Sequence, residues 1–429
     1  MERTVRPALL RGAPTPPCSK SYAQRALALA LLAEGRTTLR NLDLCDDTRR
    51  ALDAIRTLGA RIERLDASTV AVEGGLRYGR LSGERCVLRP AADRLHAGES
   101  GLAARLFAPL AALADRPLLI EGEGTLLHRP MQTVADALRQ LGARAEATGG
   151  RLPLTVCGPL RGGEARIDGS VSSQFATGLL LALPCCAEET VLRLSDAVST
   201  PYLDMTIAAA ERFGAAIFQR DYAEFYVPGG QRYRAVDYTI EGDWSAAAML
   251  LAAGAVAGEV TVGGISRLSR QADTRFCEAL ARAGAVVVDE AHAVTVVRRP
   301  LRAFEFDATD CPDLFPALAV LGAAAEGTTV LRGASRLRHK ECDRGAALRE
   351  EYGRLGIEIE MPEADVMTVR GGAPRGGRVS AHGDHRIAMS LAATALRADA
   401  PVTIEGAECV AKSFPEFFEQ LERCTAGAK

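Results

Sequence analysis

Several signals that would assign a chain to a common functional class are missing from these 429 residues. No uncharged apolar run reaches the roughly 18 residues of a membrane span. The opening residues, MERTVRPALLRG, contain no apolar core of signal-peptide length, and we expect a cytoplasmic protein. The net charge is only −2, which excludes a general attraction to nucleic acid or to an anionic membrane surface. Any site for an anion must therefore be local.

The cysteines and histidines show no pattern typical of a metal site or of a disulfide framework. The eleven cysteines are scattered from Cys18 to Cys424, and none forms a C-x-x-C pair. Their odd number and wide spacing favour small core residues in a reducing compartment. The six histidines are equally dispersed, with no H-E-x-x-H segment, and no G-x-x-x-x-G-K-S/T loop occurs. We therefore expect neither a metal site nor a nucleotide-binding loop of that type.

What the sequence does contain is an internal repeat. An amphipathic segment, a glycine and a strand-like run recur in this order, as in ALDAIRTLGARIE and VADALRQLGARAE. Glycine fits after the end of a helix that is followed directly by a strand. The phrase occurs around five glycines, spaced 70 to 83 residues apart: Gly59, Gly142, Gly214, Gly284 and Gly356.

A second phrase, a helix of small and apolar residues followed by a turn and a β-branched strand, occurs six times. Together the two phrases predict six α/β units of about 70 residues, three in each of two domains, with a break near Gly242. Because the helix of the second phrase is apolar on nearly every face, we expect it to be buried on all sides. The six copies align on Thr37, Pro117, Thr190, Val260, Thr329 and Pro401.

The starts of these six helices carry an unusual set of residues: CSKSYAQR, AGESGLAAR, SVSSQF, EGDWS, DCPDLF and HGDHR. Ser, Asp and Gly are ordinary N-cap residues, and capping alone would explain most of the starts. Capping does not explain Lys20, Arg25, Arg105, His385 and Arg386. A cation there opposes the helix dipole, and burial raises its cost. A bound phosphate or carboxylate would resolve the conflict, provided that the helix starts of each domain converge.

A second group of ionisable residues lies in RLRHKECDRGAALREEYGRLG. Lys340 and Arg344 are i,i+4 neighbours, so two cations share one helix face. Glu341 is adjacent to them, and Asp313 comes from the CPDLF helix start. A solvated helix face would also explain the segment. A carboxylate beside cations, however, keeps a low pKa and can act as a base, and a less compensated one can act as an acid.

Two further cations stand before predicted helices. Lys412 precedes the aromatic helix of AKSFPEFFEQL, although a surface lysine would explain it as well. Arg129 directly precedes Pro130, and proline fits the first position of a helix. We therefore expect Arg129 at another helix N-terminus.

Seven segments, in order and over nearly the whole chain, resemble the 5-enolpyruvylshikimate-3-phosphate synthase (3-phosphoshikimate 1-carboxyvinyltransferase) family: SKSYAQRALALA, GESGLAAR, DGSVSSQF, VSTPYLDMT, HKECDR, GDHRIAM and AKSFPEFF. The resemblance implies an α/β (α+β) fold of two domains, each with three βαβαββ units and buried helices whose N-termini face an interdomain cleft. Residues 1–18 and 242–429 would form the domain with the acid/base and phosphoenolpyruvate-binding residues. Residues 19–241 would form the domain with most shikimate 3-phosphate-binding residues.

The family transfers the enolpyruvyl group of phosphoenolpyruvate to the 5-hydroxyl of shikimate 3-phosphate, a step of chorismate and aromatic amino acid biosynthesis. Phosphate leaves through an addition–elimination with a tetrahedral intermediate. Both substrates are polyanions, which agrees with the cations at the helix starts. The resemblance implies no metal, no organic cofactor and no nucleic-acid or membrane partner, and we expect a monomer.

Carried over by position, the resemblance implies Asp313 as the base, Glu341 as the acid and Lys20 in an assisting role, with His385 supporting Arg386 and Glu341. The residues implied for shikimate 3-phosphate are Lys20, Ser21, Arg25, Ser172, Ser173, Gln174, Ser199, Tyr202, Asp313, Arg336 and Lys340. The residues implied for phosphoenolpyruvate are Lys20, Gly101, Arg129, Gln174, Arg344, Arg386 and Lys412.

The sequence departs from the family at four of the positions compared: Cys18 replaces Gly, Glu99 replaces Asn, Leu102 replaces Thr and Arg336 replaces Asn. Because the residues implied for proton transfer remain, we expect an active enzyme with altered substrate binding. The alternative is a non-catalytic phosphometabolite-binding paralogue, which a turnover measurement would distinguish from an enzyme.

Two related families fit the sequence less well. The related transferase acting on UDP-N-acetylglucosamine has a longer loop with a reactive Cys, which EGEGTLLHRP lacks. The SKS and DHR segments do not suit an RNA 3'-phosphate cyclase.

The departures predict weak inhibition by glyphosate. Members of the family that are sensitive to it carry Thr and Pro at the positions of Leu102 and Leu106. Changed side chains here could displace Gly101 and weaken glyphosate without abolishing phosphoenolpyruvate binding. An inhibition curve of the purified protein measures this, and a sensitivity equal to that of a typical bacterial member would contradict it.

Overall fold

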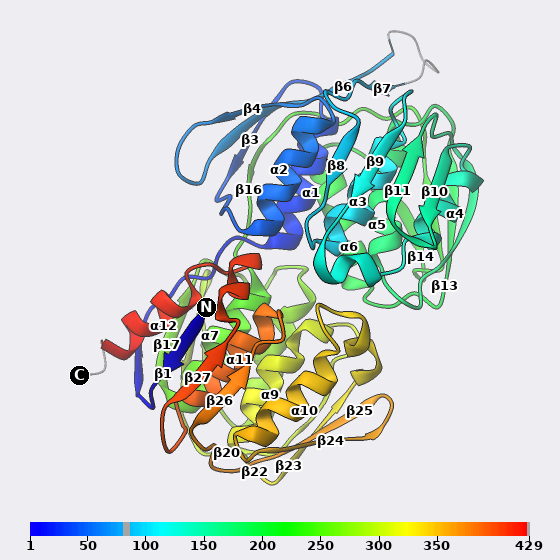
Figure 1. Cartoon of the computed structure of the whole chain (residues 1–429). Helices are drawn as coiled ribbons and strands as arrows, with labels where there is room; N and C mark the ends of the chain where they lie inside the picture. Colours follow the sequence, from blue (N-terminus) through cyan, green and yellow to red (C-terminus); the bar gives the residue numbers. More distant parts are fainter. Residues whose placement is uncertain (80–85, 427–429) are drawn as a thin grey trace. The chain divides into compact units, whose positions relative to one another are not determined.

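The computed structural model describes residues 1–79 and 86–426 and divides into two compact units (Figure 1). The N-terminal unit spans Cys18–Ile240, and the C-terminal unit combines Met1–Pro17 with Glu241–Lys429. Both units mix helices with parallel and antiparallel strands, which confirms the predicted α/β class. No helix among the described residues has both the length and the apolar composition needed to cross a bilayer.

The helices of the N-terminal unit form an inner and an outer set. The inner helices are α1 (Lys20–Leu32), α3 (Gly101–Ala111) and α5 (Gln174–Ala182), and the outer helices are α2 (Asp46–Thr57), α4 (Gln132–Gln140) and α6 (Pro201–Arg212). The short 3-10 helices are η1 (Gly124–His128) and η2 (Leu183–Cys185). The strands are β3 (Arg36–Arg40), β4 (Arg61–Arg64), β5 (Val70–Glu73), β6 (Leu76–Arg77), β7 (Val87–Leu88), β8 (Arg94–His96), β9 (Leu118–Glu121), β10 (Arg144–Thr148), β11 (Arg151–Cys157), β12 (Gly163–Asp168), β13 (Thr190–Ser195), β14 (Phe218–Arg220), β15 (Glu224–Val227) and β16 (Asp237–Thr239).

The C-terminal unit repeats this arrangement. Its inner helices are α7 (Trp244–Ala257), α9 (Phe315–Ala324) and α11 (His385–Ala395), and its outer helices are α8 (Phe276–Ala283), α10 (Arg344–Arg354) and α12 (Phe417–Ala426). Its 3-10 helices are η3 (Ala272–Arg275), η4 (Pro312–Leu314), η5 (Ala334–His339) and η6 (Ala407–Lys412). Its strands are β1 (Glu2–Val5), β2 (Leu10–Gly12), β17 (Gly258–Gly263), β18 (Val286–Asp289), β19 (Ala293–Val297), β20 (Leu301–Arg302), β21 (Glu305–Asp307), β22 (Ala325–Glu326), β23 (Thr328–Arg332), β24 (Glu358–Glu363), β25 (Val366–Arg370), β26 (Gly377–Ser380) and β27 (Val402–Glu405).

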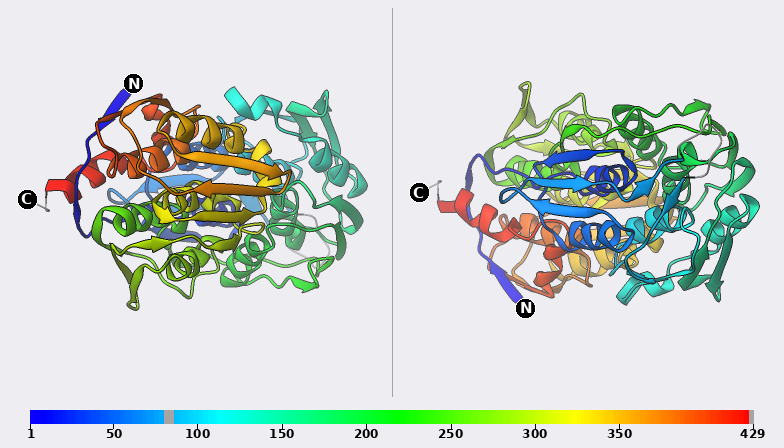
Figure 2. Two further views of the ribbon diagram at one scale, coloured as in Figure 1. Left: turned by 90° about the horizontal axis from the view of Figure 1, so that it is seen from below. Right: turned by 90° about the horizontal axis from the view of Figure 1, so that it is seen from above.

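Most of the described sheets share one plan, in which two parallel strands continue into an antiparallel pair. The orders are β16-β3-β5-β4, β8-β9-β11-β10, β12-β13-β15-β14, β2-β17-β19-β18 and β21-β23-β25-β24. The sheet β1-β27-β26 differs, because β1 from the start of the chain lies antiparallel beside β27. Figure 2 shows the blue strands β3 and β5 over α1 (right) and the yellow to orange strands β23–β25 in front of the helices of their own unit (left). The number of repeat units stays a prediction.

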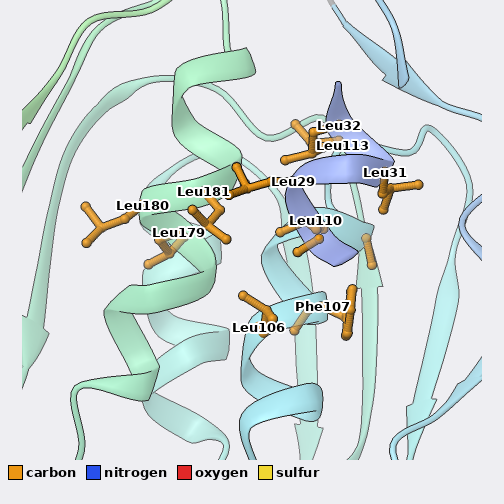
Figure 3. Close-up of a cluster of buried hydrophobic side chains, with 14 of the residues drawn as sticks. Leu29, Leu31, Leu32, Leu106, Phe107, Leu110, Leu113, Leu179, Leu180 and Leu181 are labelled. Carbon is orange, nitrogen blue, oxygen red and sulfur yellow. The ribbon is translucent and has the colours of Figure 1, made fainter. Parts of the chain in front are cut away.

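The inner helices are buried along their length, as their small and apolar residues predict. Every residue of α3 and α11 is buried, and so is every residue of α1 from Tyr22 to its end. Figure 3 shows how leucines and a phenylalanine of α1, α3 and α5 point into one cluster in the N-terminal unit. Burial on all sides is therefore confirmed for these helices, and their N-terminal residues are held rigidly by the core behind them.

The five repeated glycines follow helices of the outer set. Each has a positive φ, between +78° and +106°, in the left-handed region that glycine enters at little cost. The chain can therefore leave each outer helix and enter the next strand directly. Gly59, Gly142, Gly214, Gly284 and Gly356 are these residues.

Three strands carry a buried threonine at equivalent positions. Thr37, Thr190 and Thr329 are fully buried, and their Oγ1 atoms have no hydrogen-bond partner among the described residues. Each faces a valine on the antiparallel neighbour: Val72, Val227 and Val369. At the matching place of β17 the residue is itself a valine, Val260.

Replacing Thr190 by Val should raise the free energy of unfolding by about 1 kcal/mol, because a buried hydroxyl without a partner is removed at nearly constant volume. Thr37→Val and Thr329→Val should act alike, and the gains should add because the residues lie in separate sheets. Urea denaturation measures the change. Thr261→Val is the control, since the Thr261 hydroxyl shares a 2.8 Å hydrogen bond with Thr295 Oγ1 and its loss should bring no gain. Destabilisation by the buried substitutions would contradict the argument.

Candidate functional site

In the N-terminal unit, the first cation of α1 has a protein partner. Ser19 caps the helix, its Oγ accepting from the Tyr22 amide. Lys20 Nζ lies 3.0 Å from a carboxylate oxygen of Asp47, a buried residue in the first turn of α2. The charge of Lys20 is therefore balanced within the protein, and Lys20 alone does not require a bound anion.

The second cation of α1, Arg25, is in a different situation. Its guanidinium is buried and donates to Thr206 Oγ1, at 2.9 Å, and to the backbone oxygens of Ser21 and Tyr202, at 2.9 and 3.0 Å. No carboxylate of the described chain forms an ion pair with it. Burial therefore lowers the pKa of Arg25 to about 10. A nearby anion would stabilise this charge.

A third cation, Arg105, lies on α3, and it too forms no ion pair with a carboxylate of the described part of the chain. It donates to Gln174 Oε1, at 2.8 Å, and to the backbone oxygen of Pro130, and its guanidinium covers the ring of Phe175. Burial, followed by the like charge of Arg129, lowers the pKa of Arg105 to about 9. The sequence identified Arg105 as an unexplained cation, but it was not among the implied site residues.

These side chains converge at Gly101, the first residue of α3. A methyl group on Gly101 would lie 2.8 Å from Arg129 Nη1 and 3.6 Å from both Arg105 Nη1 and Gln174 Oε1. The helix N-terminus adds the positive end of its dipole, and Ser100 caps it. Two guanidinium groups, an amide and a helix start therefore surround one small volume beside a residue without a side chain. Such a place attracts a phosphate or a carboxylate.

The expected position of Arg129 was wrong in one respect. The helix α4 begins at Gln132, so Pro130 lies before the helix rather than at its first position. Met131 and Gln132 both donate their backbone N–H groups to the backbone oxygen of Gly150, and this loop contact sets the helix start. Arg129 instead follows the short helix η1 and reaches Gly101 from there.

The remaining implied residues of this unit lie at the starts of α5 and α6. Ser172 Oγ accepts from the backbone N–H of Gln174, and Ser173 is buried. Ser199 is buried with a φ of +55°, and its backbone oxygen accepts from the Tyr202 amide. The left-handed backbone at Ser199 is unfavourable for a residue with a side chain, which is typical of functional positions.

Three of the departures from the family are absorbed into the packing of this unit. Cys18 is buried, and its sulfur accepts from the Asp43 amide while Asp43 Oδ2 accepts from the Cys18 amide. The Glu99 carboxylate lies against Gly124, where any side chain would meet Glu99 Oε1 at 1.6 Å. Leu102 is buried in α3.

In the C-terminal unit, Asp313 is surrounded by cations. Its Oδ1 lies 3.0 Å from Lys340 Nζ and 2.9 Å from Arg344 Nη1, and its Oδ2 lies 3.2 Å from Arg386 Nη2. Burial by itself would raise the pKa of Asp313. The charges of its three partners outweigh burial and hold that pKa well below its usual range. Asp313 is therefore ionised at neutral pH.

Arg344 links three carboxylates and has no exposed surface. Besides Asp313 it contacts Glu341 Oε2, at 2.7 Å, and Asp384 Oδ2, at 2.8 Å. Burial opposes its charge, but the carboxylates raise the pKa of Arg344 above its usual range. The alternative of a solvated helix face is therefore wrong for this residue. Asp384 was missed as a partner, because in GDHR it was interpreted only as the N-cap of α11, which it also is.

The other implied residues of this unit are partly or fully buried. Lys412, at the end of η6, is 7% exposed, so the alternative of a surface lysine is wrong. His385 is buried at the start of α11, with Nδ1 3.8 Å from Asp384 Oδ1. Arg336, in η5, donates to the backbone oxygen of Thr309 at 3.5 Å.

A group of possible metal ligands lies apart from these residues, on α10 and after β26. It consists of Glu350, Glu351 and His382. The oxygens of the buried Glu351 already contact His382 Nε2, at 2.7 Å, and the Ser380 amide, at 2.9 Å. Arg354 pairs with Glu350 at 2.6 Å. Protein donors and a cation thus satisfy these carboxylates without an ion.

The matches to known proteins cover nearly the whole chain. The family model described as "EPSP synthase (3-phosphoshikimate 1-carboxyvinyltransferase)" matches residues 6–421. The 3-phosphoshikimate 1-carboxyvinyltransferase of Thermococcus kodakarensis is 41% identical over 417 residues, which cover 96% of this chain and 97% of the relative. That of Aeropyrum pernix is 38% identical over 426 residues, covering 98% and 95%. A solved EPSP synthase structure from Acinetobacter baumannii has a TM-score of 0.84 at 28% identity, covering 99% of this chain and 98% of that one.

Gly101→Ala should weaken anion binding without unfolding the protein. The added methyl group would displace the Arg129 guanidinium, and losing one charge-assisted hydrogen bond should reduce affinity about tenfold or more. Stability should change little, because the displaced atoms are the end of a flexible side chain. Titration calorimetry with inorganic phosphate, together with thermal unfolding, measures both quantities. Gly353→Ala, where a methyl group meets open space, is the control, and equal affinities of the two variants would contradict the argument.

Proposed function

The chain belongs to the EPSP synthase (3-phosphoshikimate 1-carboxyvinyltransferase) family, and from this premise we propose that it transfers the enolpyruvyl group of phosphoenolpyruvate to the 5-hydroxyl of shikimate 3-phosphate. Inorganic phosphate is released. The observation that carries the proposal is the pair of buried cations Arg25 and Arg105, which have lowered pKa values and form no ion pair with a carboxylate among residues 1–79 and 86–426. Each gains from an anionic ligand, and both proposed substrates carry several negative charges.

We propose that the N-terminal unit binds shikimate 3-phosphate around Arg25. Arg25 donates to the backbone oxygens of Ser21 and Tyr202. Ser173 and Ser199 are buried just before the starts of α5 and α6. Hydroxyls and free helix N–H groups suit a phosphate monoester. The volume at Gly101 would hold an anionic group of phosphoenolpyruvate, with Arg129 and Gln174 as donors.

In the C-terminal unit, Asp313 is the proposed base and Glu341 the proposed acid. Arg344 and Arg386 now neutralise Asp313, which makes it a weak base. An anionic substrate competes for these cations. As they turn toward the ligand, the pKa of Asp313 rises and its ability to accept a proton increases. Substrate binding would therefore activate the base.

The proposed reaction has two steps, an addition and an elimination. The 5-hydroxyl oxygen attacks C2 of phosphoenolpyruvate and gives its proton to Asp313, while the methylene carbon takes a proton from Glu341. The tetrahedral intermediate next breaks its C–O bond to phosphate, which leaves with the proton held by Asp313. The new methyl group returns a proton to Glu341, and this restores the double bond. Cations facing the phosphate stabilise the charge that it carries away.

The alternative, a non-catalytic phosphometabolite-binding paralogue, is not favoured. The relatives carry the name of an enzyme over nearly their full length, and the acid, the base and their cations are all present and in contact. A binding protein would have no need of Glu341 beside Arg344.

Purified protein mixed with both substrates, without added metal, should release phosphate. Asp313→Ala should lower the rate by about 100-fold or more, the range typical of a lost general base. Asp289→Ala, which removes an exposed carboxylate of the same unit, is the control and should retain full activity. A chain that binds shikimate 3-phosphate saturably but releases no phosphate would overturn the proposal in favour of the paralogue.

A further inference from the structure

A buried carboxylate outside the proposed machinery lies in the C-terminal unit. Asp273, in η3, is 2% exposed and forms no ion pair with a cation of the described chain. Ser245, in the first turn of α7, donates its hydroxyl to Asp273 Oδ2. The other oxygen, Oδ1, is buried without a hydrogen-bond partner among the described residues. An ionised carboxylate in this state is costly, whereas a protonated one is much less so.

The charges that act on Asp273 come from three elements. Asp313 of η4 and Asp243, the N-cap of α7, repel its negative charge, and Arg386 of α11 attracts it. Burial, followed by the charge of Asp313, raises the pKa of Asp273 to about 7. The Cys311 thiol is near as well, but burial raises its pKa far above neutral, so it stays uncharged.

The charge balance of the neighbouring cluster depends on this group. An ionised Asp273 adds one negative charge beside this cluster, which opposes an incoming anion, whereas a protonated Asp273 adds none. The members of the cluster are Lys340, Arg344, Arg386, Asp313, Glu341 and Asp384.

We propose that Asp273 sets the charge of the anion site at Arg344 and Arg386. Asp273 is neutral whenever an anion is bound there, and anion binding therefore takes up a proton. The proton comes from solvent and adds to a carboxylate oxygen of Asp273. Asp273 touches no ligand and acts through Arg386, so it is a positioning residue. The inference rests on the proposed anion-binding role of the two arginines, but not on the transfer reaction.

The direction of the pH dependence follows. Below about pH 7 Asp273 is already neutral, and binding needs no proton. Above that pH it is ionised in the free protein, and a bound anion that engages Arg386 raises its pKa further. By linkage, affinity then falls by up to about tenfold per pH unit as the pH rises.

Sulfate is the probe, because it stays a dianion over the whole range and releases no proton itself. Titration calorimetry of the full chain in two buffers of different ionisation enthalpy, from about pH 6 to 8.5, gives the protons taken up per anion. The wild type should take up as much as about one proton near pH 8, and Asp273→Asn should take up none there while still binding sulfate. Equal uptake by the two proteins, or none by the wild type, would overturn the proposal.

Ser245→Ala provides a second test that does not remove the carboxylate. Losing the hydrogen bond from Ser245 should raise the pKa of Asp273, so proton uptake should persist with its maximum at higher pH. An unchanged pH profile would count against the proposal even if Asp273→Asn failed to fold. Proton uptake without phosphate release would contradict only the proposed reaction. Phosphate release without proton uptake would contradict only the inference on Asp273.

Discussion

The constraint on which the structure depends is the burial of guanidinium groups at the starts of helices. The inner helices cannot move to hydrate these charges, because apolar packing surrounds them on all sides. The two units meet the constraint differently. The C-terminal unit surrounds Arg344 and Arg386 with carboxylates, whereas the partners of Arg25 and Arg105 that the structure describes are neutral oxygens and an aromatic face.

The two units are therefore expected to contribute differently to ligand binding. An anionic ligand that reached Arg25 or Arg105, as we propose, would add a charge partner that the described residues do not supply, so affinity would come from these contacts. A ligand that reaches Arg344 or Arg386 must replace a carboxylate that is already bound, so the net gain there is small. In the proposed mechanism this exchange would instead raise the pKa of Asp313. One unit is thus suited to holding a ligand and the other to reacting to its arrival.

Sequence patterns predicted the parts that depend on local chemistry. Burial of the inner helices follows from their composition, and the glycines such as Gly59 follow from the need for a left-handed residue between helix and strand. Pairings between distant segments were not predictable. Nothing in SKS indicates that Asp47 will balance Lys20, and nothing in QADTRF places Asp273 within the field of Asp313. The start of α4 was missed for the same reason, since Gly150 sets it from across a turn.

The strands supplied from far along the chain have a consequence for synthesis on the ribosome. The N-terminal unit can complete its last sheet once β16 has joined β3, when about half of the chain has been made. The C-terminal unit cannot do the same, because β2 waits for β17 and β1 waits for β27, which ends at Glu405. The strands β1 and β2 are therefore among the last to find their partners. Until then the N-terminal segment stays unpaired, and the C-terminal unit lacks the strands β1 and β2 at the edges of two of its sheets.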